Sequence, residues 1–224
     1  MSTATRARRA PGTPRRRSGV TRERVVDEAL AIIERDGVDA LSMRKLSAQL
    51  GVVPTSIYWH VGGREQLLDA VVERYTERLV ATAVRGRTPE ARLLSVARQI
   101  RDMARDHANL TAVALERGLS PALALPMQIA LAREITAAGL RGKRAARATR
   151  SILYVVGGFI VLEPCMPPAI PAQRRSEELW ADVEDPALDP GLIQEMRKPA
   201  ELDDVFEHTL TTLIASLLAT ERRP

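Results

Sequence analysis

The chain has 224 residues, enough to bury one or two hydrophobic cores. Aromatic residues make up only 3% of it, while Ala, Leu, Val and Arg are abundant, a composition that favours helices over a β-sandwich. Its single cysteine, Cys165, cannot form an internal disulfide, which indicates a reducing cytoplasm, and its longest apolar run, residues 152–162, is too short to span a bilayer.

Residues 1–19 form a basic arm with six arginines and no acidic residue. These arginines exceed the net charge of the whole chain, +5, so the remainder is close to neutral. The high charge and low apolar content predict disorder, and no apolar segment follows that would make a secretory signal. Two interpretations stay open: the arm follows DNA phosphates or a minor groove, or it is a solvated tail.

Residues 21–36 form the first predicted helix. Apolar side chains from Val26 to Ile33 recur at i, i+3, i+4 and i+7, which makes one apolar face. Thr21 is a candidate N-cap, and Gly37 is suited to end the helix.

Residues 41–64 then predict two short helices joined by a tight turn. The first has an apolar stripe from Met43 to Leu50, and Gly51 follows it, where a left-handed residue ends a helix. Pro54 suits the first turn of the second helix because its missing N–H has no partner there in any case. This arrangement is typical of a helix-turn-helix, whose second helix enters the major groove of DNA.

The second short helix has one purely apolar residue, Ile57, which we expect in the core. Polar and aromatic residues surround it, and the segment from Ser42 to Arg64 holds three cations and no carboxylate, which suits a DNA surface. The alternative is an ordinary helical hairpin with Tyr58 and Trp59 as core residues.

The resemblance to a known family rests on residues 21–30 (TRERVVDEAL), 37–52 (GVDALSMRKLSAQLGV), 57–61 (IYWHV) and 67–70 (LLDA). Together they resemble the DNA-binding domain of the tetracycline-repressor (TetR) family, and residues 58–61 resemble the tetracycline-repressor subgroup in particular. The resemblance covers about residues 20–80 and strongly favours the helix-turn-helix interpretation.

The resemblance implies an all-α fold with two domains after the arm. A three-helix helix-turn-helix domain would occupy residues 20–66, and a larger helical domain for effector binding and dimerisation would occupy residues 67–224. Helical patterns in the second part cover residues 64–83, 89–106, 109–117, 121–138, 143–163 and 201–221, with a proline-rich loop at 164–200 that has short turns near 177–183 and 191–196. Pro126 is expected to kink its helix or delay its start.

The implied DNA contacts follow from the position of each residue on the two short helices. Thr55 and Ser56 are expected at base edges near the start of the second helix, with Arg44 reaching in from the first. The residues expected on the phosphates are Tyr58, Trp59, His60 and Arg64.

The second half of the chain shows no catalytic constellation, no metal motif and no phosphate loop, so we expect no enzyme, no cofactor and no metal. The resemblance implies a small-molecule effector there. The candidates for the pocket, chosen by their place in the family layout, are Met103, Leu110, Met127 and Tyr154, with His107 as a polar group.

One departure from the family pattern concerns the effector. An ungapped extension of the match puts Val80 where the tetracycline repressor has a drug-contacting histidine, and residues 108–118 contain no histidine for a metal. We therefore expect the effector not to be magnesium–tetracycline.

The family forms dimers through its last two long helices, which here would be residues about 143–163 and 201–221. Residues 152–162 are apolar on nearly every side, and Gly157 and Gly158 would let another helix approach closely. The alternative is a core helix within one subunit.

The resulting prediction is a cytoplasmic, ligand-responsive repressor that binds a palindromic operator in double-stranded DNA as a homodimer, with no membrane partner. Two other interpretations compete with it: an enzyme or scaffold that carries a helix-turn-helix, and a non-specific DNA binder acting through the arginine arm.

Overall fold

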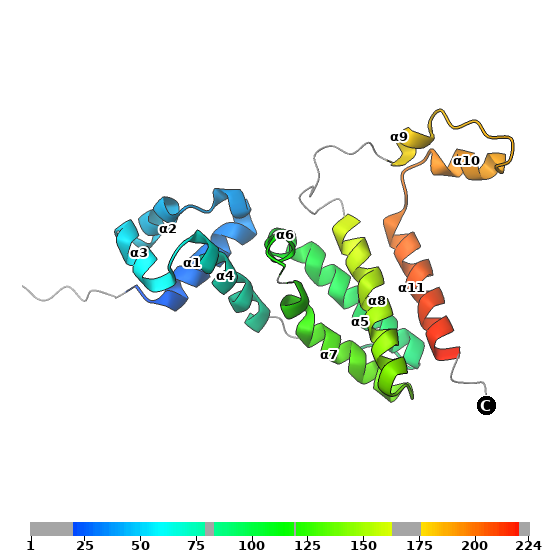
Figure 1. Cartoon of the computed structure of the whole chain (residues 1–224), viewed down its shortest axis with the longest axis horizontal. Helices are drawn as coiled ribbons and strands as arrows, with labels where there is room; N and C mark the ends of the chain where they lie inside the picture. Colours follow the sequence, from blue (N-terminus) through cyan, green and yellow to red (C-terminus); the bar gives the residue numbers. More distant parts are fainter. Residues whose placement is uncertain (1–19, 79–82, 119, 163–175, 220–224) are drawn as a thin grey trace, which may run out of the picture.

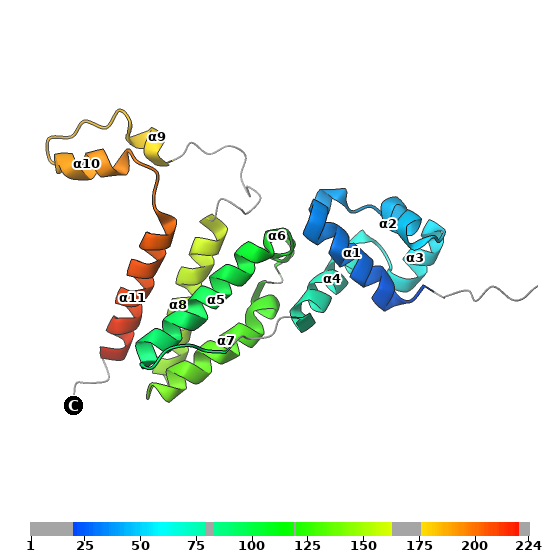
Figure 2. The same ribbon diagram turned by 180° about the vertical axis from the view of Figure 1, so that it is seen from behind.

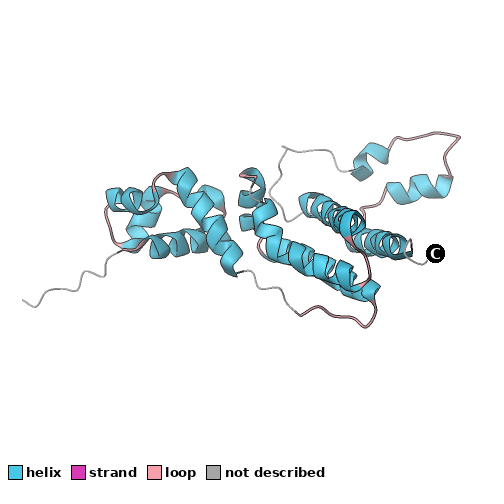
Figure 3. Cartoon of the chain, turned by 60° about the horizontal axis from the view of Figure 1, so that its bottom comes forward, coloured by secondary structure: helices cyan, strands magenta, loops and turns pink. Residues whose placement is uncertain are grey.

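The computed structural model describes residues 20–78, 83–118, 120–162 and 176–219; the basic arm and Val80 lie outside this range. Within it the chain forms helices and no strand, which confirms the predicted all-α class (Figure 3). The elements in chain order are α1 (Arg22–Asp36), the 3₁₀ turn η1 (Val38–Ala40), α2 (Met43–Leu50), α3 (Pro54–Val61), α4 (Arg64–Arg78), α5 (Pro89–Asp106), α6 (Ala108–Glu116), α7 (Ser120–Ala137), α8 (Gly142–Leu162), α9 (Ser176–Trp180), α10 (Pro190–Met196) and α11 (Leu202–Ala219).

The first hydrophobic core joins α1, α2, α3 and α4 into one compact unit (Figure 1). Leu30 and Ile33 of α1 meet Leu46 of α2 and Ile57 of α3 there, all of them fully buried. This core also includes residues from much later in the chain, because Leu110, Val113 and Ala114 of α6 pack into it. A helix from the second half therefore completes the unit that carries the helix-turn-helix.

Local capping interactions set the ends of these helices. The Thr21 hydroxyl accepts the N–H of Arg24 at 3.3 Å, and the Ser42 hydroxyl accepts the N–H of Lys45 at 3.1 Å. Each bond satisfies a backbone donor that the first turn of a helix leaves unpaired, an effect of about 1 kcal/mol. Gly51 has φ 68°, the left-handed conformation that glycine adopts without strain, and it turns the chain from α2 into α3.

The second hydrophobic core joins α5, α7, α8 and α11. Arg101 of α5 is buried beside this core, with its guanidinium 4.4 Å from the ring centroid of Phe206 and 2.8 Å from a carboxylate oxygen of Asp203. A cation against an aromatic face and a carboxylate keeps this burial from costing a large desolvation energy. The contact ties the start of α11 to α5.

The predicted helices agree with the observed ones to within one or two residues in most of the described range. α7, predicted over residues 121–138, begins at Ser120 and runs through Pro126, so the proline does not delay its start, and a kink there stays a prediction. The proline-rich loop does contain two short helices, α9 and α10, which stand apart from both cores at the end where α8 finishes (Figures 1 and 2).

Candidate nucleic-acid interface

Helix α3 is buried on one side and open on the other. Ile57 and Val61, four residues apart, both point into the first core. Between them Tyr58 is 50% exposed and Trp59 is 83% exposed. These two aromatic residues therefore do not form the core of a hairpin, and the alternative interpretation of this segment is wrong.

The beginning of α3 is also open. Pro54 occupies the first helical position, Thr55 is exposed, and no side chain caps the first turn. The Trp59 and His60 rings meet edge to face with centroids 4.9 Å apart, so the two residues form one surface after Thr55 and Ser56. The outer face thus carries hydroxyl groups at its start, next to the positive end of the helix dipole, and aromatic and imidazole groups towards its other end.

The two cations of α2 have different surroundings, which the sequence does not reveal. The Lys45 ammonium lies 3.0 Å from the carboxylate of Asp36, which also binds Arg35 at 2.9 Å. Hydrogen bonds from Arg35 and then from Lys45 hold the pKa of Asp36 well below its usual value. Arg44 is exposed and pairs with no carboxylate among the described residues, so its charge is available to a ligand such as DNA.

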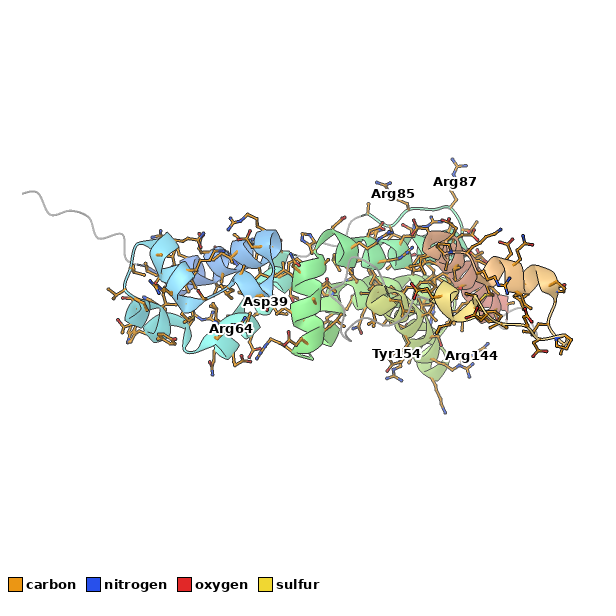
Figure 4. The ribbon with its side chains drawn as sticks, turned by 90° about the horizontal axis from the view of Figure 1, so that it is seen from above. Asp39, Arg64, Arg85, Arg87, Arg144 and Tyr154 are labelled. Carbon is orange, nitrogen blue, oxygen red and sulfur yellow. The ribbon has the colours of Figure 1, made fainter. Side chains whose placement is uncertain are left out.

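Arg64 has a structural contact that sequence reasoning missed. Its guanidinium donates to the carbonyl oxygen of Val38 at 3.1 Å, which links the start of α4 to η1. The side chain remains exposed beside Asp39 (Figure 4). Because a guanidinium has five N–H donors, this bond leaves others for the phosphate contact that we predict.

The joint between α3 and α4 fixes the direction of α3. Gly62 has φ 75°, a conformation that an L side chain rarely adopts. The next residue, Gly63, donates its N–H to the side-chain oxygen of Gln66 at 2.9 Å, which caps α4. The Gly62 conformation and this cap set the direction in which α4 leaves α3.

Helix α4 in turn contacts the second half of the chain through α6. Arg117, at the end of α6, reaches two carboxylates of α4, that of Asp69 at 2.5 Å and that of Glu65. At the other end of α6, His107 Nδ1 lies 3.2 Å from the Glu34 carboxylate and the Asn109 amide donates to the Glu34 carbonyl at 3.2 Å. Both ends of α6 are thus attached to the unit that carries α3.

The five residues predicted for the effector pocket do not all belong to one cluster, although Met103 packs against the second core, which contains Met127. Leu110 lies in the first core, Met127 is buried in the second core, and Met103 packs beside the second core. His107 lies at the corner between α5 and α6, paired with Glu34. Tyr154 does not belong with them, since it is 79% exposed on the outer side of α8 (Figure 4).

Tyr75 of α4 is a polar group that the sequence did not single out. Its side chain is buried, its ring lies 5.0 Å from that of His107, and its hydroxyl has no hydrogen-bond partner among the described residues. Burial, together with the charges of Glu34 and Asp106, raises the pKa of Tyr75 above its usual value. An unpartnered buried hydroxyl costs about 1–3 kcal/mol, so a ligand that supplied an acceptor would gain affinity there.

Comparison with known proteins agrees with this geometry. Residues 25–71 match the family model for bacterial regulatory proteins of the tetR family. The chain belongs to the TetR family. The match contains α2 and α3 entirely, so these two helices are the helix-turn-helix of this family, and the predicted family is confirmed.

The relatives of this TetR-family chain support the same conclusion over different lengths. An HTH-type transcriptional regulator of Saccharopolyspora erythraea is 29% identical over 139 residues, 62% of this chain and 59% of the relative. The class D tetracycline repressor protein of Escherichia coli is 42% identical over 52 residues, 23% of this chain and 24% of the relative. The aligned part of the chain thus spans about three fifths of the first relative and a quarter of the second.

A solved structure matches nearly the whole chain. The Streptomyces coelicolor TetR-family protein ActR, in complex with actinorhodin, superposes with a TM-score of 0.67 and 25% identity, covering 91% of this chain and 99% of that one. The relatives and the solved structure named here are transcriptional regulators of a non-enzymatic family, which supports a DNA-binding transcriptional regulator over an enzyme.

Proposed function

We propose that this TetR-family regulator is a ligand-responsive repressor, which binds a near-palindromic operator as a homodimer and leaves it when a small apolar or amphipathic effector binds. The observation that carries the DNA-binding part is α3, which buries Ile57 and Val61 and presents Thr55, Tyr58 and Trp59 outward. A two-turn helix reads few bases, so useful specificity requires two copies on two half-sites, about 34–36 Å apart for adjacent groove faces.

The outer side of α8 supports a dimer. Tyr154, Val161 and Leu162 are exposed there, and a Cβ added at Gly157 or Gly158 would meet no atom within 4 Å. Contiguous apolar surface on a soluble protein marks an interaction site. The open glycines would let a helix of a second subunit approach closely.

The length and composition of α8 alone would also allow it to cross a membrane, with a mean hydropathy of 1.4. Its inner side, however, packs Ile152, Val156 and Ile160 into the second core, and its first half carries four cations. These features favour a second subunit over lipid as the partner of its outer side. Because the proposed repressor acts on DNA, we place it in the cytoplasm.

The effector part of the proposal rests on the junction of α4, α5 and α6. Tyr75 offers an unpartnered hydroxyl there, and α6 connects this region to α4 through Arg117. A ligand that displaced α6 or α4 would turn α3 away from its half-site. The ligand must bind the DNA-incompetent state more tightly than the other, because equal affinity for both states would shift nothing. ActR, bound to actinorhodin, is a family member with a ligand.

A mobility-shift assay on the DNA that flanks the protein's own gene tests the DNA-binding part. We expect a shift that survives an excess of random competitor DNA and that Arg44→Ala weakens. The matched control is Arg87→Ala, which removes the same charge from an exposed site between α4 and α5, far from α3 (Figure 4). A shift that random DNA abolishes would instead support a non-specific binder.

The basic arm needs its own comparison. Deletion of residues 1–19 removes six cations, so we expect weaker operator binding at low salt and an unchanged melting temperature. Equal affinity with and without the arm across a salt titration would identify it as a solvated tail.

A further inference from the structure

The α9–α10 extension, which we define as residues 178–200, is held together by its own contacts. The Arg197 guanidinium donates to the carbonyl oxygens of Trp180 and Val183, both at 3.2 Å, and so ties α10 to the end of α9. Apart from each other, neither helix packs extensively against a described helix. Leu179, Leu192 and Met196 are exposed on it, so the extension has apolar surface that no described residue covers.

The extension is also strongly acidic. It contains six carboxylates, all exposed, and only two cations. Both cations are used within it: Arg197 binds the two carbonyl groups, and Lys198 pairs with Glu195 at 2.6 Å. Among the described residues no cation lies within salt-bridge distance of Glu178, Asp182 or Glu184. The carboxylates without a cation partner therefore give this surface a negative potential.

The first half of α8 has the opposite character. Lys143, Arg144, Arg147 and Arg150 are exposed there, and the sequence contains no carboxylate from residue 135 to residue 162. Within one subunit the two surfaces lie apart. α9 and α10 are located where α8 finishes, whereas the cations are near its beginning (Figure 1), and a 21-residue helix is about 30 Å long.

Two-fold symmetry would bring the two surfaces together. Two copies of α3 can face one DNA molecule only if the symmetry axis runs along the direction from the second core to the first. Figures 1 and 2 show α8 and α11 crossing that direction. A rotation of 180° reverses a helix that crosses its axis, so α8 of the second subunit runs antiparallel to α8 of the first. The beginning of one α8 then lies beside the end of the other.

We propose that the α9–α10 extension of each subunit docks on the basic first half of α8 in the second subunit. The exposed carboxylates meet the partner's cations, and Leu179, Leu192 and Met196 lose solvent contact at the same time. This inference rests on the homodimer of the proposed function. It adds a charged contact between residues 178–200 of one subunit and the first half of α8 of the other, which we call the clasp. Symmetry makes this contact twice, on either side of the apolar contact between the α8 helices.

Charge reversal in the full-length chain tests the clasp. One variant carries Asp182→Lys and Glu184→Lys, and the other carries Arg147→Glu and Arg150→Glu; all four side chains are exposed, so both variants should fold with the wild-type helix content. We expect each variant to dimerise about tenfold or more weakly in sedimentation equilibrium at low salt, since like charges then face each other. The difference should shrink at about 1 M salt, where the Debye length is about 3 Å.

Mixing the two variants separates contacts between subunits from contacts within one. In a mixed dimer, the extension with reversed charge in one subunit faces the α8 with reversed charge in the other. The unchanged extension and the unchanged α8 also face each other, so opposite charges meet at both contacts. We therefore expect the mixture to recover dimer affinity to within a few-fold of wild type. Failure to recover, or no effect of either variant on a dimeric wild type, would overturn the clasp and leave the homodimer intact. A wild type that is monomeric at micromolar concentration would refute the homodimer itself.

Discussion

The outer faces of α3 and α8 both expose aromatic side chains, and both helices are anchored in a core by their other side. On α3 the exposed Trp59 is accompanied by Thr55 and Ser56, and the exposed cation of Arg44 is on the preceding helix α2. On α8 the exposed Tyr154 is accompanied by two glycines and aliphatic residues. The first face offers hydrogen bonds and charge to a polar partner, whereas the second offers close approach to another apolar helix. The neighbours of an exposed aromatic residue thus indicate its partner better than the aromatic residue does.

The largest effect is expected from removing Ile57, the buried side chain that holds α3 in the first core and so orients its outer face. Ile57→Ala deletes a fully buried side chain, and we expect a loss of about 2–5 kcal/mol in the free energy of unfolding together with loss of operator binding. The control is Val53→Ala, an exposed residue just before α3, which should change stability by less than about 0.5 kcal/mol. Thermal and denaturant unfolding would measure both. A cost below about 1 kcal/mol for Ile57→Ala would contradict the packing described here.

The matching test on α8 places a charge in the proposed dimer contact. Gly158→Arg should make the dimer at least about 100-fold weaker, because it buries a guanidinium against apolar surface. It should not destabilise the subunit, since the site is open and replacing a helical glycine gains up to about 1 kcal/mol of helix propensity. Ala137→Arg, at an exposed position of α7, is the control. Sedimentation velocity would show whether the first variant alone becomes monomeric.

Arg44→Ala examines the reading of bases by α2 and α3. We expect a loss of about 1–3 kcal/mol in operator binding and a weaker preference for operator over altered sequences, if Arg44 reads a guanine. Arg64→Ala should instead weaken binding to all sequences about equally and lower the salt slope by about one phosphate contact. Fluorescence titrations with operator and single-base variants would separate the two patterns, and operator affinity equal to wild type in both would remove these residues from the interface.

Arg117→Ala tests whether α6 transmits the effector signal to α4. Arg117 is 18% exposed, but its partners Glu65 and Asp69 are largely solvated, so we expect less than about 1 kcal/mol of stability to be lost. Release of operator by the effector should become weaker while operator affinity without effector changes little. The measurement is operator affinity with and without the effector, once an effector is identified by a thermal-shift screen. Undiminished release would show that the signal follows another route.

The smallest expected effect concerns acid stability. Arg74 donates to the Asp27 carboxylate at 2.9 Å and holds the pKa of Asp27 below its usual value of 3.8. The stabilisation is complete above that value and is lost as the pH falls through the lower pKa of the folded protein. Between about pH 5 and pH 2, wild type should therefore lose slightly more stability than Asp27→Asn. Asp182→Asn, at a carboxylate without a cation partner, should follow wild type.

The helix-turn-helix was predictable because its signals are local. Gly51 ends α2, Pro54 starts α3, and a single apolar residue, Ile57, shows which side faces inward. The pairing of Lys45 with Asp36 was not predictable, since it joins residues nine positions apart across a turn. The two adjacent cations of α2 look equivalent in the sequence, and only the packing of α1 against α2 distinguishes them.

The effector region was less predictable for a physical reason. The second half of α8 is apolar on nearly every side, so the sequence does not show that residues 152, 156 and 160 face inward and Tyr154 outward. Leu110 was assigned to a pocket from its position along the chain, whereas it completes the first core. The periodicity of a helix shows which of its residues are buried. It does not show which hydrophobic core they join when that core lies in a distant part of the chain.

The participation of α6 in the first core bears on how this protein can be rebuilt. A sensor made by grafting residues 20–78 onto a foreign effector half would lack Leu110, Val113 and Ala114, and the inner sides of α1 and α4 would face water. Such a chimaera would fold poorly even though each helix of the graft is complete. A chimaera that folds would need α6 of this protein as well as residues 20–78. The junctions with the foreign sequence would then lie between α5 and α6 and at Gly118, after Arg117.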